Sequence, residues 1–526
     1  MSDRTVLTNA TVITSDPHAP HATTVLVQGE RIALVGGNDL ATAAAADGVA
    51  VVDLAGAVVA PGFIDAHNHL SVAALHPLWH DVRGLADRDV LVEAVRAQAA
   101  AEPDVDWVRL QGIVLLGPGR GITRHDLDAA GVDRPVIVAD STLHQCVVSS
   151  HALDRLGLGQ GSDAPANGEI GREADGTPDG VLVEAAWSDA HATSMRAYCD
   201  PDRWAEHVAA RARTLLADGI TCVHDAACAP EAEALYRAMA SAGNLPIDVV
   251  GMPHPAALLR NDHTARLDGP VTGEGDDRFR VGAIKLFADG GVAIALDVTV
   301  QGFSLRVGTL FGDLDEHARR AADRGFRLAI HAMGNLGVQA MIDTATGIAR
   351  AHPGRDHRFR IEHAGVTGPD QWRALADLGA VAVVQPGFVE HVGHRAGGAH
   401  FDEHHWLAFA GLAEAGVTLA GSSDDPCAPV PPLWGLALGI GRRTSTGVDF
   451  EVDQALPFTD WLTAYTRGAA YAGGQEHERG MLAPGLLADL VVLDRAAPDA
   501  RVLQTWKRGT CVHRADPVDL LAPGER

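Results

Sequence analysis

Eight short apolar segments recur along the middle of the chain, alternating with stretches rich in alanine and leucine. Apolar runs that alternate with helical stretches are typical of repeated β/α units and a parallel sheet. Eight such units close a TIM-type barrel. The sequence therefore predicts an α/β fold built on a (β/α)8 barrel, with strands at residues 58–67, 220–224, 247–252, 281–287, 327–331, 359–363, 381–385 and 417–422.

Both ends of the chain have a different character from the middle. Short strand-like runs separated by turn residues predict a small β unit before the barrel and another after it. The gap between the first two barrel strands, residues 71–217, is too long for a loop and predicts a folded insertion. Because this insertion begins at the carboxyl end of the first strand, we expect it to cover the active site.

The bulk properties favour a protein that acts on small molecules. With 68 acidic and 42 basic residues, the formal charge of −26 disfavours binding to nucleic acids or anionic membranes. The six cysteines lack paired-ligand spacing, and no signal-peptide or membrane-spanning segment is evident. We expect a cytoplasmic protein with a small-molecule substrate and no nucleic-acid or membrane partner. The sequence is compatible with a homo-oligomer but does not determine the oligomeric state.

Two histidines end the first predicted strand, in the segment Pro61-Gly62-Phe63-Ile64-Asp65-Ala66-His67-Asn68-His69. Residues i and i+2 of a strand point to the same side, so both imidazoles can reach one metal ion. A lone His-x-His pair is more often part of an ordinary turn. Here the pair follows an apolar β-branched run, as in a buried parallel strand that delivers ligands at its carboxyl end.

Four further polar residues stand at the ends of later predicted strands: Lys285, His331, His363 and Asp424. Each has an ordinary structural interpretation when taken alone. A strand lysine usually reaches solvent or an ion pair, and a lone histidine is often a satisfied core residue. Downstream of His-x-His, the two histidines at matching strand ends predict a shared metal centre. Lys285 and Asp424, with Asp425 as the competitor of Asp424, join this set only through the resemblance that follows.

The ordered set of His-x-His, lysine, two histidines and aspartate resembles the binuclear pattern of the amidohydrolase superfamily. The long insertion and the segment Ala283-Ile284-Lys285-Leu286-Phe287-Ala288-Asp289-Gly290 are similar to the YtcJ-like branch, which includes N-substituted formamide deformylases. The resemblance implies a barrel over residues 61–479 and a composite β-sandwich domain formed by residues 1–60 and 480–526. One departure is Asn335, which stands where this branch commonly has aspartate.

The resemblance also implies the cofactors and the mechanism. Two divalent metal ions would be bound by His67, His69, Lys285, His331, His363 and Asp424. Zinc is the first expectation, and manganese, iron and nickel are the alternative metals. Lys285 would be carboxylated and bridge the ions, and Asp424 would act as general base and then acid. A metal-activated hydroxide would hydrolyse a carbon–nitrogen bond in a small amide, such as an N-formyl or N-acyl amine.

Two other functions remain open at the level of sequence. A cyclic amidohydrolase or heterocycle deaminase would use the same barrel, although a mononuclear deaminase has no need of Lys285. A non-catalytic barrel scaffold would be expected to lack ligands, whereas every ligand position is filled here.

Four residues outside the metal set are candidates for substrate binding: Trp79, His144, Glu184 and His224. Each also has a structural interpretation. Trp79 is suited to a hydrophobic core, Glu184 to an ion pair, and His224 to packing at the end of the second strand.

Overall fold

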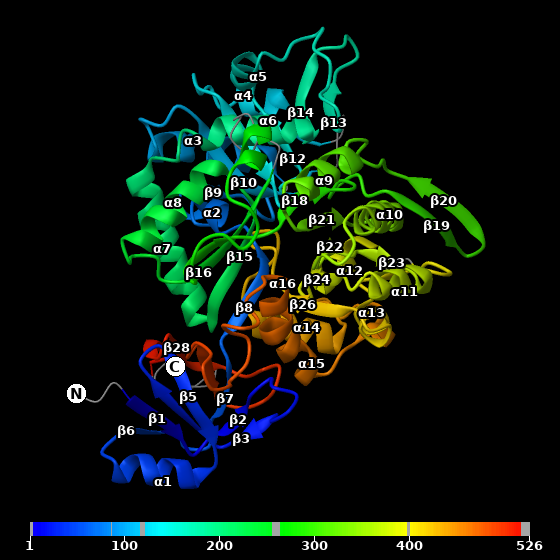
Figure 1. Ribbon diagram of the computed structural model, residues 1–526. Helices are drawn as coiled ribbons and strands as arrows, with labels where there is room; N and C mark the ends of the chain where they lie inside the picture. Colours follow the sequence, from blue (N-terminus) through cyan, green and yellow to red (C-terminus); the bar gives the residue numbers. More distant parts are fainter. Residues whose placement is uncertain (1–3, 86, 116–120, 255–262, 397–399, 517–526) are drawn as a thin grey trace.

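The computed structural model describes residues 4–85, 87–115, 121–254, 263–396 and 400–516. Strands from the two ends of the chain lie at the bottom of Figure 1, central strands with their helices lie in the middle, and the insertion lies at the top. Residues 1–3 and 517–526, which fall in the predicted terminal domain, lie outside the described residues. No helix in the described ranges is long and apolar enough to cross a lipid bilayer.

The central strands are parallel and form two sheets whose edges meet. One sheet has the order β17-β16-β15-β8 and the other the order β18-β21-β22-β24-β26. Gly282, between β17 and β18, donates from its N–H to the Gly251 carbonyl of β16 at 2.7 Å, and Asp424, after β26, donates from its N–H to the His67 carbonyl of β8 at 2.8 Å, so hydrogen bonds connect segments of the two sheets at both places. The strands are β8 (Phe63–Asn68), β15 (Ile220–Cys228), β16 (Asp248–Pro253), β17 (Phe279–Val281), β18 (Ile284–Phe287), β21 (Leu328–Ala332), β22 (Arg360–His363), β24 (Val381–Val384) and β26 (Thr418–Gly421).

Helices alternate with these strands and cover them from outside (Figure 1). In α10 (Asn335–Ala351) the buried residues Val338, Met341, Ile342, Ala345 and Ile348 follow helical spacing and turn one face to the core. The arrangement is a TIM-barrel-like α/β fold, as the sequence predicts at this level. The other helices of this region are α7 (Pro201–Ala217), α8 (Pro230–Ser241), α9 (Leu314–Asp323), α11 (Pro369–Asp377), α12 (Phe388–Ala396), α13 (Phe409–Glu414), α14 (Pro432–Gly441), α15 (Phe458–Thr463) and α16 (Ala469–Ala472).

Two of the predicted strands are each divided in the structure, which corrects their predicted bounds. The segment 58–67 forms β7 (Val58–Pro61) and β8, which belong to different sheets. Gly62 lies between them, where a β-carbon would meet the Thr221 side chain at 2.5 Å, so only glycine allows this close crossing. The segment 281–287 is likewise split between β17 and β18.

Strands from both chain ends share a sheet of the order β29-β28-β27-β7-β2-β3. Four more N-terminal strands pair in the order β5-β4-β1-β6, with α1 (Asn38–Ala46) packed on them. The bounds are β1 (Arg4–Thr8), β2 (Thr11–Ile13), β3 (His21–Ala22), β4 (Thr24–Gln28), β5 (Arg31–Gly36), β6 (Ala50–Asp53), β27 (Leu490–Leu493), β28 (Val502–Lys507) and β29 (Thr510–Arg514).

The insertion between β8 and α7 contains a six-stranded sheet of the order β13-β14-β12-β11-β10-β9. Its strands are β9 (His80–Asp81), β10 (Val108–Ile113), β11 (Val136–Asp140), β12 (Gln145–Val148), β13 (Gly168–Arg172) and β14 (Pro178–Glu184). Its helices are α2 (Leu70–Ala73), α3 (Arg88–Ala101), α4 (Arg124–Asp128), α5 (Ser150–Leu156) and α6 (Ala185–Met195). The short loop between β11 and β12, residues 141–144, reaches down to the central strands and is called the partition loop below.

Candidate metal centre

The first pair of predicted ligands lies at the end of β8. His67 is fully buried, with Nδ1 2.5 Å from Oε2 of Glu362 and Nε2 without a hydrogen-bond partner among the described residues. His69 Nδ1 lies 2.9 Å from the Ala226 carbonyl oxygen, and its Nε2 lies 3.0 Å from Oδ1 of Asp424. Each ring is therefore oriented through one nitrogen, and the other nitrogen turns toward Asp424.

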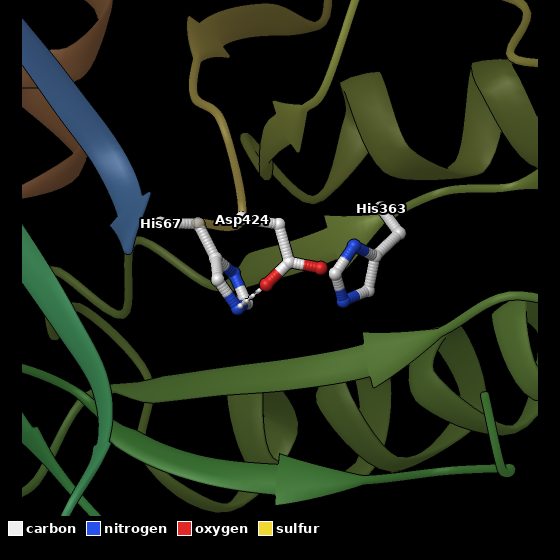
Figure 2. Close-up of side chains that lie close together, drawn as sticks. All are labelled: His67, His363 and Asp424. Atoms are coloured by element: carbon white, nitrogen blue, oxygen red, sulfur yellow. Dashed lines mark ion pairs between the residues drawn. The ribbon is translucent and has the colours of Figure 1, made fainter. Parts of the chain in front are cut away.

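The histidines at the ends of β21 and β22 face this pair. The ring centroid of His363 lies 4.9 Å from that of His67 and 4.6 Å from that of His331. Nδ1 of His363 contacts Oε1 of Gln385 at 2.9 Å, whereas the buried Nε2 of His331 has no hydrogen-bond partner in the described part of the chain. Figure 2 shows His67, His363 and Asp424 converging from three separate segments.

Asp424 follows β26 and lies between the imidazoles. Ligand atoms of His67, His363 and Asp424 all lie within 4.8 Å of one another. Both His363 and Asp424 have positive φ values, 76° and 61°, a strained conformation that is concentrated at functional sites. Burial opposes ionisation of Asp424, but the His67 imidazole and the hydrogen bond from His69 hold its pKa below the ordinary value.

The donor set suits a divalent metal ion. Burial lowers the pKa of His67 and of His331 well below the ordinary value and lowers that of His363 to about 4, so these imidazoles are neutral near pH 7. Neutral imidazole nitrogens and a carboxylate are the ligand types that zinc and related metals bind. The unsatisfied Nε2 atoms of His67 and His331 are otherwise costly in a buried site, and a metal ion would satisfy them.

Lys285, the second residue of β18, lies inside the same site. Its side chain is almost completely buried, and Nζ lies 4.6 Å from the centroid of the Phe287 ring. Burial lowers the pKa of Lys285 from 10.5 to about 8, so the neutral amine is far more populated at physiological pH than in an exposed lysine. A neutral amine is the form that reacts with carbon dioxide.

Two buried charged residues of β22, Arg360 and Glu362, lie behind the site and are not among the residues predicted from the sequence. Arg360 donates to Oε1 of Glu362 at 2.8 Å and to the Ala66 carbonyl at 2.6 Å, so it holds the carboxylate that contacts His67. A partner of this kind fixes the orientation and basicity of a ligand histidine. The signal that could have found them is two opposite charges two residues apart, Arg360 and Glu362, within a predicted buried strand.

His144 and Glu184 of the insertion lie together above the centre. Nδ1 of His144 lies 2.7 Å from Oε2 of Glu184, and the His144 ring centroid lies 5.4 Å from that of His331. Burial lowers the pKa of His144, but the Glu184 carboxylate outweighs burial, and the net shift is upward. A β-carbon on Gly291 would lie 2.3 Å from the His144 ring, and one on Gly290 equally close to Glu184, which explains the paired glycines after β18.

The other two substrate candidates occupy different surroundings. Trp79 is buried against Tyr198 and the Arg109 guanidinium but still lines a cavity beside the centre. His224 is fully buried and lines neither of the two cavities described below; its Nδ1 accepts a hydrogen bond from Arg360 at 3.0 Å. The expected substrate contact of His224 is therefore corrected to a supporting contact behind the centre.

Asn335, the departure from the resembled branch, lies outside both cavities. Its Oδ1 accepts a hydrogen bond from Asp297 N–H at 2.9 Å, and its Nδ2 donates to the Asp297 carbonyl at 2.8 Å. The amide therefore clamps β19 (Leu296–Val300), which pairs with β20 (Phe303–Val307). An aspartate carboxylate could not donate the second hydrogen bond, so the role of asparagine at this position is structural.

Two cavities, of about 710 and 370 Å³, meet at the centre. His331, His363, Asp424 and His144 line both of them, and His67, His69 and Lys285 line the smaller one. Volumes of this size are typical of sites for small molecules. The six predicted ligands therefore share one accessible space.

Comparison with known proteins agrees with this arrangement. A family model described as "Amidohydrolase family" matches residues 50–513. N-substituted formamide deformylase from Arthrobacter pascens is 33% identical to this chain, covering 96% of this chain and 97% of that protein. The amidohydrolase YtcJ from Bacillus subtilis (strain 168) is 28% identical, covering 84% of this chain and 85% of that protein.

A crystal structure of an uncharacterized metal-dependent hydrolase from Pyrococcus horikoshii OT3 has the same fold. Its TM-score is 0.72 at 22% identity, and the alignment covers 97% of this chain and all of that chain. The resemblance inferred from the sequence motifs is confirmed. The chain belongs to the amidohydrolase family and is a metal-dependent hydrolase that acts on carbon–nitrogen bonds.

Proposed function

We propose that this protein hydrolyses a small amide, with an N-formyl or other N-acyl amine as the representative substrate, at a centre of two divalent metal ions. One observation carries the proposal. Side chains from the ends of β8, β18, β21 and β22 and from the loop after β26 converge on one cavity that also admits a small molecule. The similarity to a formamide deformylase supports the choice of substrate class.

The proposed ligands divide into two groups. His67, His69 and Asp424 would hold one ion, and His331 and His363 the other, with zinc as the first choice because the donors are imidazoles and a carboxylate. The close approach of His67, His363 and Asp424 supports a shared centre.

We assign the bridging position to a carboxylated Lys285. An ammonium group has no lone pair for a cation, whereas a carbamate offers two oxygens. The buried surroundings of Lys285 favour the neutral amine that forms a carbamate, and Lys285 lines the same cavity as the proposed histidine ligands.

The chemistry divides between the ions and the chain. When bound, the ions would lower the pKa of a water molecule and polarise the substrate carbonyl. Asp424 takes the proton from the attacking water and passes it to the leaving nitrogen as the carbon–nitrogen bond breaks. Nε2 of His69 lies 3.0 Å from Oδ1 of Asp424, so the proposed general base stands directly beside a proposed ligand of the same ion.

We also propose a closed (β/α)8 barrel over residues 61–479 and a composite domain of residues 1–60 and 480–526. The insertion, residues 71–217, would cover the active site. The sheet that combines β2 and β7 with β27 and β28 supports the composite domain. A cytoplasmic location remains a prediction.

The test is amide hydrolysis by the zinc-loaded protein, followed as amine released from N-phenethylformamide and N-phenethylacetamide. Chelation should abolish release, and added zinc should restore it. Asp424→Asn should lower kcat by at least about 1,000-fold, because it removes the proton acceptor. Asp425→Asn is the matched control: its carboxylate pairs with Arg211 at 2.6 Å, and kcat should change less than about tenfold. Equal losses in both variants would contradict the role of Asp424.

A further inference from the structure

The partition loop lies across the metal centre and separates the two cavities. Thr142, Leu143 and His144 each line both cavities, as do the centre residues His331 and Asp424. The centre is therefore reached from both sides of one short loop.

Contacts at both ends of this loop hold it in place. The buried Asp140 carboxylate accepts hydrogen bonds from the Thr142 backbone and hydroxyl at 2.8 and 2.6 Å. On the opposite wall, the Cys427 thiol donates to the Thr142 carbonyl at 3.4 Å, and Glu184 holds His144. The loop is braced by groups from the insertion and from the segment after β26, so the separation of the cavities is built into the fold.

Each cavity has apolar side chains of its own, together with charged residues such as Arg83 and Arg395 in the larger cavity and Asp189 and Asp313 in the smaller one. Trp79, Phe388 and Val392 line only the larger cavity, whereas Trp187, Phe287 and Phe311 line only the smaller one. Both volumes, about 710 and 370 Å³, lie in the range of about 300–1,000 Å³ that accommodates a small ligand. Apolar surface that closes over an apolar substituent stabilises binding, because that surface is removed from water.

We propose that the substrate carries a sizeable apolar group on each side of the scissile carbon–nitrogen bond. The amide lies beneath the partition loop, its acyl substituent fills one cavity, and its amine substituent fills the other. This inference rests on the proposed amide hydrolysis and narrows its substrate class. An N-formyl amine has only hydrogen on the acyl carbon and leaves one cavity without a ligand, so the preferred substrates are N-acyl amines with a larger acyl group.

The first test compares two amides of the same amine, N-phenethylformamide and N-phenethyl-phenylacetamide, with the zinc-loaded wild-type protein. The proposal predicts a kcat/KM at least tenfold higher for the phenylacetamide. An equal or higher value for the formamide would overturn the two-cavity inference but leave the proposed amide hydrolysis intact. Hydrolysis of neither amide would instead contradict the proposed function.

The second test fills each cavity in turn. Ser188→Trp adds bulk to the smaller cavity and Val392→Trp to the larger one, whereas Ser304→Trp, on the exposed strand β20, is the matched control. Both cavity variants should lower kcat/KM for the phenylacetamide at least tenfold, and only one of them should do so for the formamide. If the same single variant slows both amides and the other slows neither, the second cavity does not hold substrate.

A binding measurement gives a readout that needs no turnover. Phenethylamine and phenylacetate, the two products, would occupy different cavities, so saturating one should change the calorimetric Kd of the other less than threefold. Mutual exclusion of the two products would contradict the proposal. Measuring thermal unfolding of each tryptophan variant distinguishes a filled cavity from a failure to fold.

Discussion

The Nδ1 atom of His67 lies 2.5 Å from Oε2 of Glu362, and both side chains are excluded from solvent. Arg360 holds the same carboxylate from behind through Oε1 at 2.8 Å. This chain of contacts leaves Nε2 of His67 as the free ligand atom and fixes the direction in which it points. The imidazole is thus prepared for a metal ion by residues that do not themselves face the cavities.

Glu362→Gln should therefore weaken metal binding. The carboxylate orients His67 and raises the basicity of its imidazole, and the substitution removes both effects. Such changes cost about 10- to 100-fold in metal affinity. Zinc competition against a chromophoric chelator measures the effect. Glu390→Gln is the matched control, because Glu390 pairs with His394 at 2.8 Å and lines neither cavity described here; equal affinities in the two variants would contradict the role of Glu362.

The carbamate prediction can be tested with unusual clarity, because Lys285 and Lys507 are the chain's two lysines. Nζ of Lys507 pairs with Asp248 at 2.5 Å, and Lys507 lines neither of the two cavities, so its engaged side chain lies apart from the proposed centre. Protein loaded with metal in ¹³C-bicarbonate should show one carbamate resonance by NMR. Lys285→Ala should abolish that resonance and remove one metal ion and most activity, whereas full metal occupancy with normal turnover would refute the bridging role.

Gly291→Ala should disturb His144 without touching any proposed ligand. The new β-carbon would lie 2.3 Å from Cδ2 and 2.4 Å from Nε2 of His144, so the ring must move. Displacement of a positioned group by about 1 Å can cost about 100-fold in rate, and we expect kcat/KM to fall by about 10- to 100-fold. Gly312→Ala, where a β-carbon meets no atom of the described residues within 4 Å, should leave kcat/KM unchanged. Wild-type kcat/KM in the Gly291 variant would show that the position of His144 does not matter.

The buried His224 should contribute to the pH dependence of the free energy of unfolding. Burial, aided by the Arg360 charge, lowers its pKa from 6.5 to about 3, so below pH 6.5 the unfolded chain binds a proton that the folded chain does not. The free energy of unfolding therefore falls as the pH falls, by about 1.4 kcal/mol per pH unit from this residue.

His224→Gln removes this linkage. Between pH 6.5 and about pH 5, the variant should lose about 2 kcal/mol less of its free energy of unfolding than the wild type loses. Urea unfolding of the metal-free proteins at the two pH values measures the difference. Equal losses would show that His224 is protonated in the folded chain.

The convergence of the proposed ligands on one cavity could be predicted from the sequence, because parallel strands bring their carboxyl ends to one edge. His67, Lys285, His331 and His363 each end an apolar run, and that local pattern is visible without the structure. The eight strand positions follow from the same pattern, although not the break at Gly62. That break depends on the approach of Thr221, a contact between residues far apart in the chain.

The surroundings of the ligands could not be predicted in the same way. His144 meets Gly291 and Glu184 only after the insertion folds over the central strands, and no local spacing encodes this contact. His224 was expected to face substrate because it ends a strand, but the buried Arg360 turns it into a supporting contact. Such pairings depend on tertiary packing between distant segments.

The most direct test of the proposed centre is elemental analysis of the purified chain after reconstitution with zinc and bicarbonate, expressed as metal ions per polypeptide. The bridged centre predicts two ions per chain, falling to one in Lys285→Ala. One ion or none in the reconstituted wild-type protein would contradict it.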